Sequence, residues 1–196
     1  MNKSYLIIKI LSKLIIIDNF DSFTYNLVHF LEPYCKELTV FRNDEINYDK
    51  ISVKHKILLS PGPGLPENNE ELFKVIEKFQ FTNNIMGVCL GFQAIGQFYG
   101  ANLTNLKNVR HGIQTEINVL NHDCIFRDLP THFKIGHYHS WIIDKIPNIL
   151  NITAVDYENN TMAFKHSSLD IFGIQFHPES ILTENGKQIL KNWIIN

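Results

Sequence analysis

Cys89 stands in the pentapeptide GVCLG at residues 87–91, where an apolar run ends and a helical pattern begins. A strand that ends in glycine-x-nucleophile-x-glycine and continues as a helix forms a sharp elbow, and the small glycines avoid clashes with the adjacent strand and helix. The N-terminus of the following helix lowers the pKa of a cysteine placed there. The pattern favours Cys89 as a nucleophile; the alternative is a small buried core residue, as most lone cysteines are.

An imidazole and a carboxylate follow a second apolar run, in the segment QFHPE at residues 175–179. A cysteine nucleophile needs a base, and the base needs a third group that fixes its tautomer. His177 and Glu179 can fill these two roles for Cys89, and Pro178 between them restricts their geometry. The alternative is a surface histidine beside a surface acid. A metal site would need further ligands that the spacing does not offer.

A loop rich in proline and glycine, PGPG at residues 61–64, follows an apolar run at residues 57–59. Because proline has no N–H group, Gly62 and Gly64 are the only amide donors of this tetrapeptide. Backbone N–H groups on a stiff loop can stabilise an oxyanion, and the N–H of Leu90, directly after the nucleophile, is the second donor expected from other nucleophile elbows. The alternative is a rigid connecting loop.

The other polar groups are expected to have structural or surface roles and not catalytic ones. A cluster at residues 18–22, with Asp18, Asn19, Asp21 and Ser22, is expected to be a helix cap and loop. The segment YHS at residues 138–140 lacks the glycines of an elbow, which argues against a serine nucleophile. Four histidines without companions at ligand spacing are interpreted as scattered surface residues: His111, His122, His132 and His166.

The elements that must position these groups alternate along the first half of the chain. Strands are predicted at residues 14–17, 38–41, 57–59 and 85–88, and helices at 23–31, 67–79 and 91–99. The later part is rich in β-type runs at 115–120, 149–155 and 171–176, followed by an amphipathic helix at 184–194. The predicted fold is α/β, with a mostly parallel central sheet, helices on both faces and a small antiparallel β extension. A single domain over residues 14–196 is expected after an N-terminal extension or extra strand at residues 1–13.

Composition excludes several classes of protein. The 196 residues carry a net charge of −2 without a basic cluster, which argues against binding to nucleic acid or a membrane surface. No run approaches the roughly 20 apolar residues that span a bilayer. The three widely spaced cysteines, Cys35, Cys89 and Cys124, fit a reducing cytoplasm and form no zinc motif. We therefore expect a cytoplasmic protein without a metal.

Five segments together resemble the class I (triad) glutamine amidotransferases. They are IDNFDSFTYNL at residues 17–27, LSPGPGLP at 59–66, GVCLGFQAI at 87–95, HYHSW at 137–141 and GIQFHPES at 173–180. The first segment is similar to the branch that uses chorismate, which contains the small subunits of anthranilate synthase and aminodeoxychorismate synthase. The resemblance covers the chain from about residue 14 to residue 193.

The resemblance implies a reaction and a substrate. Cys89 would attack the side-chain amide of L-glutamine and form a glutamyl thioester, His177 would pass a proton to the leaving ammonia, and Glu179 would orient His177. The ammonia would reach a chorismate-binding synthase on another polypeptide, in tryptophan or folate biosynthesis, and no cofactor is implied. The glutamine contacts implied are Gly62, Pro63, Gly64, Leu90, Gln93, Ser140 and Trp141. Spacing independently supports Gln93, which lies four residues after Cys89 and therefore shares its face of the predicted helix.

The chain departs from the pattern of the family at four positions near these segments. Phe92 stands where histidine is usual, Ile113 replaces lysine, Trp141 replaces leucine, and His137 holds a position that is often arginine. We expect altered walls of the glutamine pocket near Phe92 and Trp141, with the chemistry retained. Two alternatives remain open: a catalytically weak, glutamine-responsive regulatory protein, and an amidotransferase that serves a different synthase.

Overall fold

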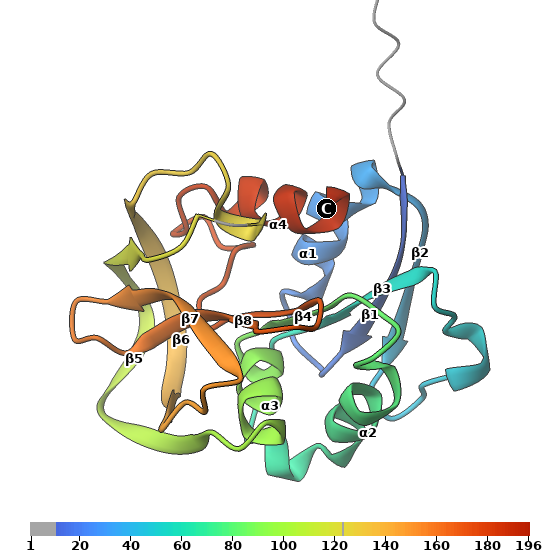
Figure 1. Ribbon diagram of the computed structural model, residues 1–196, viewed down its shortest axis with the longest axis horizontal. Helices are drawn as coiled ribbons and strands as arrows, with labels where there is room; N and C mark the ends of the chain where they lie inside the picture. Colours follow the sequence, from blue (N-terminus) through green and yellow to red (C-terminus); the bar gives the residue numbers. More distant parts are fainter. Residues whose placement is uncertain (1–10, 123) are drawn as a thin grey trace, which may run out of the picture.

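The computed structural model describes residues 11–122 and 124–196, and a single nine-stranded sheet runs through them in the order β2-β1-β3-β4-β9-β8-β7-β5-β6 (Figure 1). Five neighbouring strands are parallel: β2 (Cys35–Arg42), β1 (Ser12–Asp18), β3 (His55–Leu59), β4 (Ile85–Val88) and β9 (Ile171–Ile174). The others continue the sheet in antiparallel fashion: β8 (Thr161–His166), β7 (Leu150–Asp156), β5 (Asn102–Val119) and β6 (His132–Asp144). The expected parallel sheet with an antiparallel extension is confirmed.

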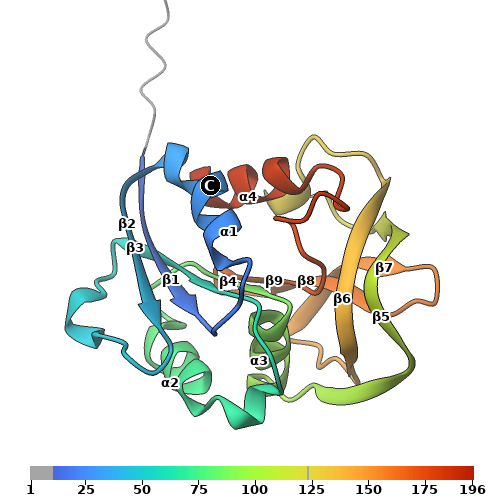
Figure 2. The ribbon, with the colours of Figure 1, turned by 180° about the vertical axis from the view of Figure 1, so that it is seen from behind.

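Helices cover both faces of the parallel part (Figures 1 and 2). Helices α1 (Thr24–Leu31) and α4 (Gly186–Ile195) lie on one face, and α2 (Glu70–Phe79) and α3 (Leu90–Phe98) lie on the other. Short 3-10 helices are Glu32–Tyr34, Tyr48–Lys50, Pro66–Asn68 and Cys124–Phe126. Each face of the sheet therefore has its own hydrophobic cluster.

Strand β1 shows why the sheet needs helices on both faces. Leu14 and Ile16 belong to the cluster under α1 and α4, whereas Ile15 and Ile17 belong to the cluster under α2 and α3. Successive side chains of a strand point to opposite faces, so an unbroken apolar run can be buried only between two layers. All four side chains are at most 1% exposed.

The ends of some elements differ from those expected. Helix α2 begins at Glu70 rather than at residue 67, because Pro66–Asn68 forms a 3-10 turn first. Strand β5 begins 13 residues before the expected start, at Asn102, and strands β6 and β8 were not recognised. Strand β6 forms the edge of the sheet beside β5, and its polar and apolar residues alternate only in part.

The N-terminal part of the chain lies mostly outside the described residues. The expected extension covers residues 1–13, of which Ser12 and Lys13 belong to β1. The division of the chain into an extension and one domain stays a prediction. In the described residues, no helix is both long enough and apolar enough to cross a membrane.

Trp193 of α4 anchors the C-terminal helix to the sheet. Its side chain is fully buried, and its Nε1 donates a hydrogen bond to Oδ1 of Asn84 at 2.6 Å. The backbone carbonyl of Trp193 accepts a second hydrogen bond, from Nζ of Lys56 at 2.8 Å. One side chain therefore combines apolar burial with a satisfied polar group.

We expect Trp193→Ala to lower the free energy of unfolding by about 3–5 kcal/mol, because it removes a large buried ring and leaves a cavity. Urea unfolding of the full chain measures this change. Ile195→Ala on the same helix is the control, since Ile195 is 43% exposed and its loss should cost far less. Equal losses for the two variants would contradict the anchoring role.

Candidate active site

The turn between β4 and α3 places Cys89 at the carboxyl end of the parallel strands. Its backbone has φ 49° and ψ −100°, in the region that L-residues rarely occupy. Such a conformation costs about 1–3 kcal/mol and persists only where the surroundings impose it. The backbone N–H of Cys89 donates to the carbonyl of Ile174 at 2.9 Å, and its carbonyl accepts from the N–H of Gln93 at 3.0 Å. The thiol is thereby held at the start of α3, and its side chain is 7% exposed.

The two glycines of the pentapeptide are required by close packing. A Cβ atom on Gly87 would lie 2.4 Å from the carbonyl carbon of Gly91, and a Cβ atom on Gly91 would lie 2.4 Å from the carbonyl oxygen of Leu59. These contacts are with backbone, which cannot move aside without displacing a strand or the helix. The elbow expected from the sequence is therefore present, and its glycines have the expected steric role.

His177 and Glu179 follow β9, the neighbour of β4 in the sheet. Nδ1 of His177 and Oε1 of Glu179 are 2.5 Å apart, and both residues are only 4% exposed. A carboxylate accepts, so this contact places a proton on Nδ1 and directs Nε2 away from the glutamate. Among the described residues, Nε2 has no hydrogen-bond partner. It is the ring atom that can exchange a proton with a reacting group.

The surroundings of His177 favour its protonated form. Burial alone would lower the pKa of His177, but the sulfur of Cys89 and the hydrogen bond and charge of Glu179 raise this pKa well above its usual value. The histidine therefore holds its proton readily beside the sulfur. A cationic imidazole next to a cysteine favours the thiolate, which is the nucleophilic form.

The loop at residues 61–64 follows β3, next to β4 in the sheet. A Cβ atom on Gly62 would lie 2.5 Å from the carbonyl oxygen of Asn19 and 2.9 Å from Cδ2 of Leu90. Gly62 thus packs against the first residue of α3, and only glycine fits there. Pro63 and Gly64 are exposed, and Gly64 has φ 80° with open space where a side chain would be.

Asn19 holds this loop in place, a role that the sequence did not indicate. Its backbone N–H donates to Oγ of Ser60 at 2.9 Å, and its Nδ2 donates to the carbonyl of Ser60 at 2.8 Å. Nδ2 of Asn43 in turn donates to Oδ1 of Asn19 at 3.2 Å. The polar cluster after β1 was interpreted only as a helix cap and loop. Its position at the end of a strand adjacent to β3 was the available signal.

Asp21, in the same cluster, lies close enough to His177 and Glu179 for their charges to change its pKa. Burial raises the pKa of its carboxyl group, while the N–H of Phe23 and the charge of His177 oppose this and the charge of Glu179 adds to it. Its Oδ2 accepts the N–H of Phe23 at 2.9 Å. Helix α1 begins one residue later, at Thr24, without a side-chain cap on its first turn.

Gln93 lies on α3 four residues after Cys89, and it is 4% exposed. Its Nε2 donates to the backbone carbonyl of Trp141 at 3.0 Å and to Oε1 of Gln175 at 3.1 Å. Trp141 therefore meets the site through its backbone. Ser140, also on β6, is half-buried.

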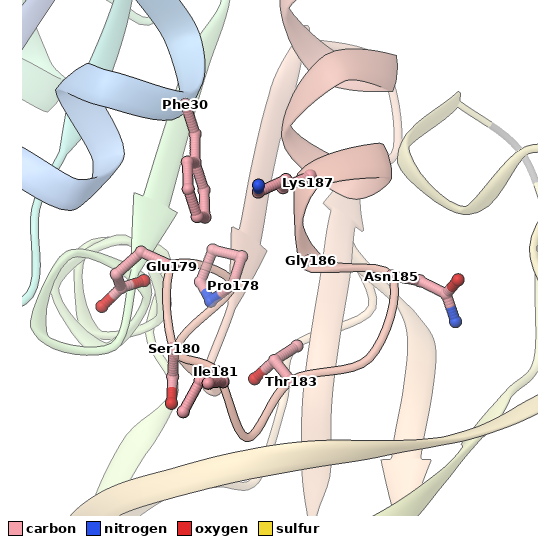
Figure 3. A pocket seen from close by; sticks show the side chains of 9 residues that line it. All are labelled: Phe30, Pro178, Glu179, Ser180, Ile181, Thr183, Asn185, Gly186 and Lys187. Carbon is pink, nitrogen blue, oxygen red and sulfur yellow. The ribbon is translucent and has the colours of Figure 1, made fainter.

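Two openings lie beside Glu179, and one of them also borders His177. One of about 250 Å³ is lined by Phe23, Asn26, Tyr138, His177, Glu179, Ser180 and Ile181. The ring of Tyr138 meets the ring of His177 edge-on at 5.0 Å, and its hydroxyl group lies 2.9 Å from Oγ of Ser180. The other opening, of about 450 Å³, lies between α1 and the start of α4, where Phe30 and Lys187 approach the loop at 178–183 (Figure 3). Glu179 borders both.

One expectation about a single side chain is wrong, and another stays a prediction. Phe92 is fully buried and stacks on Phe164, with the ring centroids 4.7 Å apart, in the cluster under α2 and α3. Its expected effect on the walls of the glutamine pocket stays a prediction, whereas the expectation for His166 is wrong. His166 is not a surface residue but 2% exposed, and its Nδ1 accepts the N–H groups of Ser168 and Leu169. Burial lowers the pKa of His166. Among the described residues, no group of three or more histidines, cysteines or acids could hold a metal ion.

Comparison with known proteins agrees with this geometry. Residues 15–196 match the family model described as glutamine amidotransferase class-I. A protein of Haemophilus influenzae provisionally named anthranilate synthase component II is 42% identical over 184 residues, which cover 93% of this chain and 95% of the relative. The aminodeoxychorismate/anthranilate synthase component 2 of Bacillus subtilis is 39% identical over 187 residues, which cover 92% and 95%.

A solved structure has the same fold. A Thermoplasma acidophilum protein provisionally described as a GMP synthase subunit superposes with a TM-score of 0.85 at 25% sequence identity, over 94% of this chain and 92% of that one. Its likeness extends over both the parallel sheet and the antiparallel extension, because nearly the whole of each chain is covered. From the family match and the relatives above 30% identity, we conclude that this chain belongs to the class I glutamine amidotransferases.

Proposed function

We propose that this chain hydrolyses L-glutamine to glutamate and ammonia and delivers the ammonia to a separate chorismate-using synthase. The observation that carries the proposal is the buried set of Cys89, His177 and Glu179 at the ends of two adjacent parallel strands. The names of the relatives, component II or component 2 of anthranilate and aminodeoxychorismate synthases, support the choice of synthase.

The reaction proceeds through a thioester. The sulfur of Cys89 attacks the carbonyl carbon of the glutamine side chain, and Nε2 of His177 gives its proton to the departing nitrogen, which leaves as ammonia. A water molecule then attacks the thioester while His177 accepts its proton, and glutamate leaves as Cys89 is regenerated. Glu179 keeps the ring of His177 in the tautomer and orientation that both steps require.

Backbone groups stabilise the negative oxygen of the tetrahedral intermediates. We assign this role to the N–H of Leu90 and the N–H of Gly62, which belong to residues in close contact. Asn19 fixes the Gly62 loop through its hydrogen bonds to Ser60. Donors that are already in place when charge develops need no reorganisation during the reaction.

The glutamine lies, in this proposal, between the 61–64 loop and the start of α3. Both hydrogen bonds donated by Nε2 of Gln93 stay within the protein, which leaves its Oε1 to accept from the substrate. The remaining contacts proposed are Gly62, Pro63, Gly64, Leu90, Ser140 and Trp141. Because Trp141 meets the site through its backbone, its side chain can differ from that of other members without loss of this contact.

The partner synthase docks, we propose, over the opening beside His177. Apolar side chains are exposed there, with Phe23 45% and Ile181 99% exposed. Such groups on the rim of a catalytic opening suit a permanent protein partner. We place both proteins in the cytoplasm, where the three cysteines would stay reduced, as their free state fits.

We expect the wild-type chain to release glutamate slowly alone and faster with a chorismate-using synthase, because partner binding completes many such sites. Cys89→Ala should reduce the rate to background under both conditions. Cys124→Ala, which removes another free cysteine, is the control and should keep the wild-type rate. If the wild-type chain releases glutamate no faster than Cys89→Ala, with and without the synthase, the proposal is wrong. Reconstitution with each synthase, and identification of the aromatic product, distinguishes anthranilate from aminodeoxychorismate synthesis.

We expect Glu179→Gln to lower kcat by about 10²–10⁴-fold, because His177 loses the charge that holds its orientation and proton. Glu179 raises the pKa of His177, so its neutralisation lowers that pKa. The imidazolium then disappears at lower pH, and the alkaline limb of the kcat/KM profile should move to lower pH. The exposed Glu184, replaced by glutamine, is the control. An unmoved alkaline limb would contradict the role of Glu179.

We expect Gly62→Ala to lower kcat by about 10²–10³-fold, the usual effect of one lost oxyanion donor. The added Cβ would lie 2.5 Å from the carbonyl oxygen of Asn19, so the loop must move away from Leu90. Steady-state glutamate release measures the effect, and the melting temperature separates it from unfolding. A folded variant with unchanged kcat would show that Gly62 supplies no donor.

A further inference from the structure

A buried chain of amide groups ends at the sulfur of Cys89. Nε2 of Gln175 lies 3.7 Å from Sγ of Cys89 as a hydrogen-bond donor, and the Gln175 side chain is fully buried. Oε1 of Gln175 accepts from Nε2 of Gln93 at 3.1 Å, and the same nitrogen of Gln93 donates to the carbonyl of Trp141 at 3.0 Å. The chain of contacts thus runs from the backbone of β6 to the nucleophile.

The backbone carbonyl of Trp141 fixes the direction of the whole chain. A carbonyl oxygen can only accept, so the amide nitrogen of Gln93, and not its oxygen, must face it. The same nitrogen meets Gln175, whose oxygen must therefore be the atom that faces Gln93. The nitrogen of Gln175 is then left to face the sulfur. The identity of the atom next to Cys89 follows from the network rather than from the shape of one side chain.

The sheet explains why Gln175 reaches the sulfur. Val88 is paired with Ile174 in the parallel register of β4 and β9, so Cys89 and Gln175 are the next residues along two neighbouring strands. The backbone on both sides is held, by the bond from Cys89 N to Ile174 O at 2.9 Å and by the bond from Gln175 N to Met162 O at 2.8 Å. Gln175 is therefore held beside Cys89 at both its backbone and its side chain.

We propose that Gln175 is a further catalytic residue, which donates its side-chain N–H to the sulfur of Cys89 and stabilises the thiolate. The inference rests on the proposed role of Cys89 as nucleophile. Hydrogen bonding to the charged form of a group favours that form, so the thiolate is held by this N–H as well as by the cationic His177. Gln93 acts here as a positioning residue, because it reaches the sulfur only through Gln175.

The same bond serves both halves of the reaction. Before attack, it increases the fraction of Cys89 present as thiolate. When the thioester is hydrolysed, the carbon–sulfur bond breaks and the electron pair returns to sulfur as a thiolate, which the N–H of Gln175 again stabilises. No proton is transferred to or from Gln175, because an amide side chain does not ionise at the pH values at which proteins are folded.

The test is the pH dependence of alkylation of Cys89 by iodoacetamide in the full chain, with the labelled cysteine identified by peptide mass. Gln175→Met fills a similar volume without a donor, and we expect it to move the midpoint of alkylation up by about one pH unit, the size expected for a lost bond to a charged group. Gln93→Met should move it in the same direction by less, since Gln175 loses the bond that orients it.

Gln97→Met is the matched control, the same substitution on the same helix at a half-buried glutamine away from the sulfur, and it should leave the midpoint unchanged. The melting temperature of each variant is measured in parallel. A lower melting temperature with an unmoved midpoint would mean that Gln175 only supports the fold, and would overturn the proposal.

Two further outcomes have a defined meaning. If Gln175→Met does not fold, the proposal is tested with Gln93→Met instead. An unchanged midpoint of Cys89 alkylation in that variant overturns the proposal. Alkylation needs no glutamine, so the result is independent of the proposed hydrolysis. A shifted midpoint in a chain that releases no glutamate would reject the function and keep the thiolate bond.

Discussion

The site depends on the parallel pairing of β4 and β9. Val88 stands opposite Ile174, and the hydrogen bond from Cys89 N to Ile174 O extends this pairing past the end of β4. Parallel neighbours end at the same edge of a sheet, which is why residues 86 positions apart in the chain, Cys89 and Gln175, become neighbours. A slip of one residue would turn the side chains after β9 to the other face and would separate His177 from the sulfur.

This pairing can hold strained backbone because it is packed on every side. All four residues of β4 are buried, and so are the first seven residues of α3. The backbone around Gly87 and Gly91 is packed too closely to change its conformation. The carbonyl oxygen of Leu59, for example, would lie only 2.4 Å from a Cβ atom on Gly91. The unfavourable φ of Cys89 is therefore sustained by the core. The same packing brings Leu90 against Gly62, so the nucleophile and the proposed oxyanion donors are positioned by one set of contacts.

Elements with a strong local pattern could be predicted from the sequence. Strands β1 and β4 are continuous apolar runs, and the glycines around Cys89 have a steric purpose that is visible in five residues. Buried polar residues could not be predicted in this way. Asn19 and Nδ1 of His166 form hydrogen bonds with another loop or with the backbone turn that follows, and such contacts leave no periodic signal in the sequence. Strand β6 was missed because its central residues carry histidines that are buried only by tertiary packing.

The two halves of the sheet contribute differently to the site. The parallel half supplies the reactive groups, whereas β6 of the antiparallel half supplies a backbone carbonyl at Trp141 and the ring of Tyr138 against His177. A carbonyl contact does not depend on the side chain that follows it, so tryptophan in place of leucine at position 141 leaves the link to Gln93 intact. Phe92 packs on Phe164 in the core and lies beside Gly173 of β9. The departure at position 141 therefore leaves the contact with Gln93 unchanged, whereas the departure at position 92 is absorbed by the packing between α3 and the sheet.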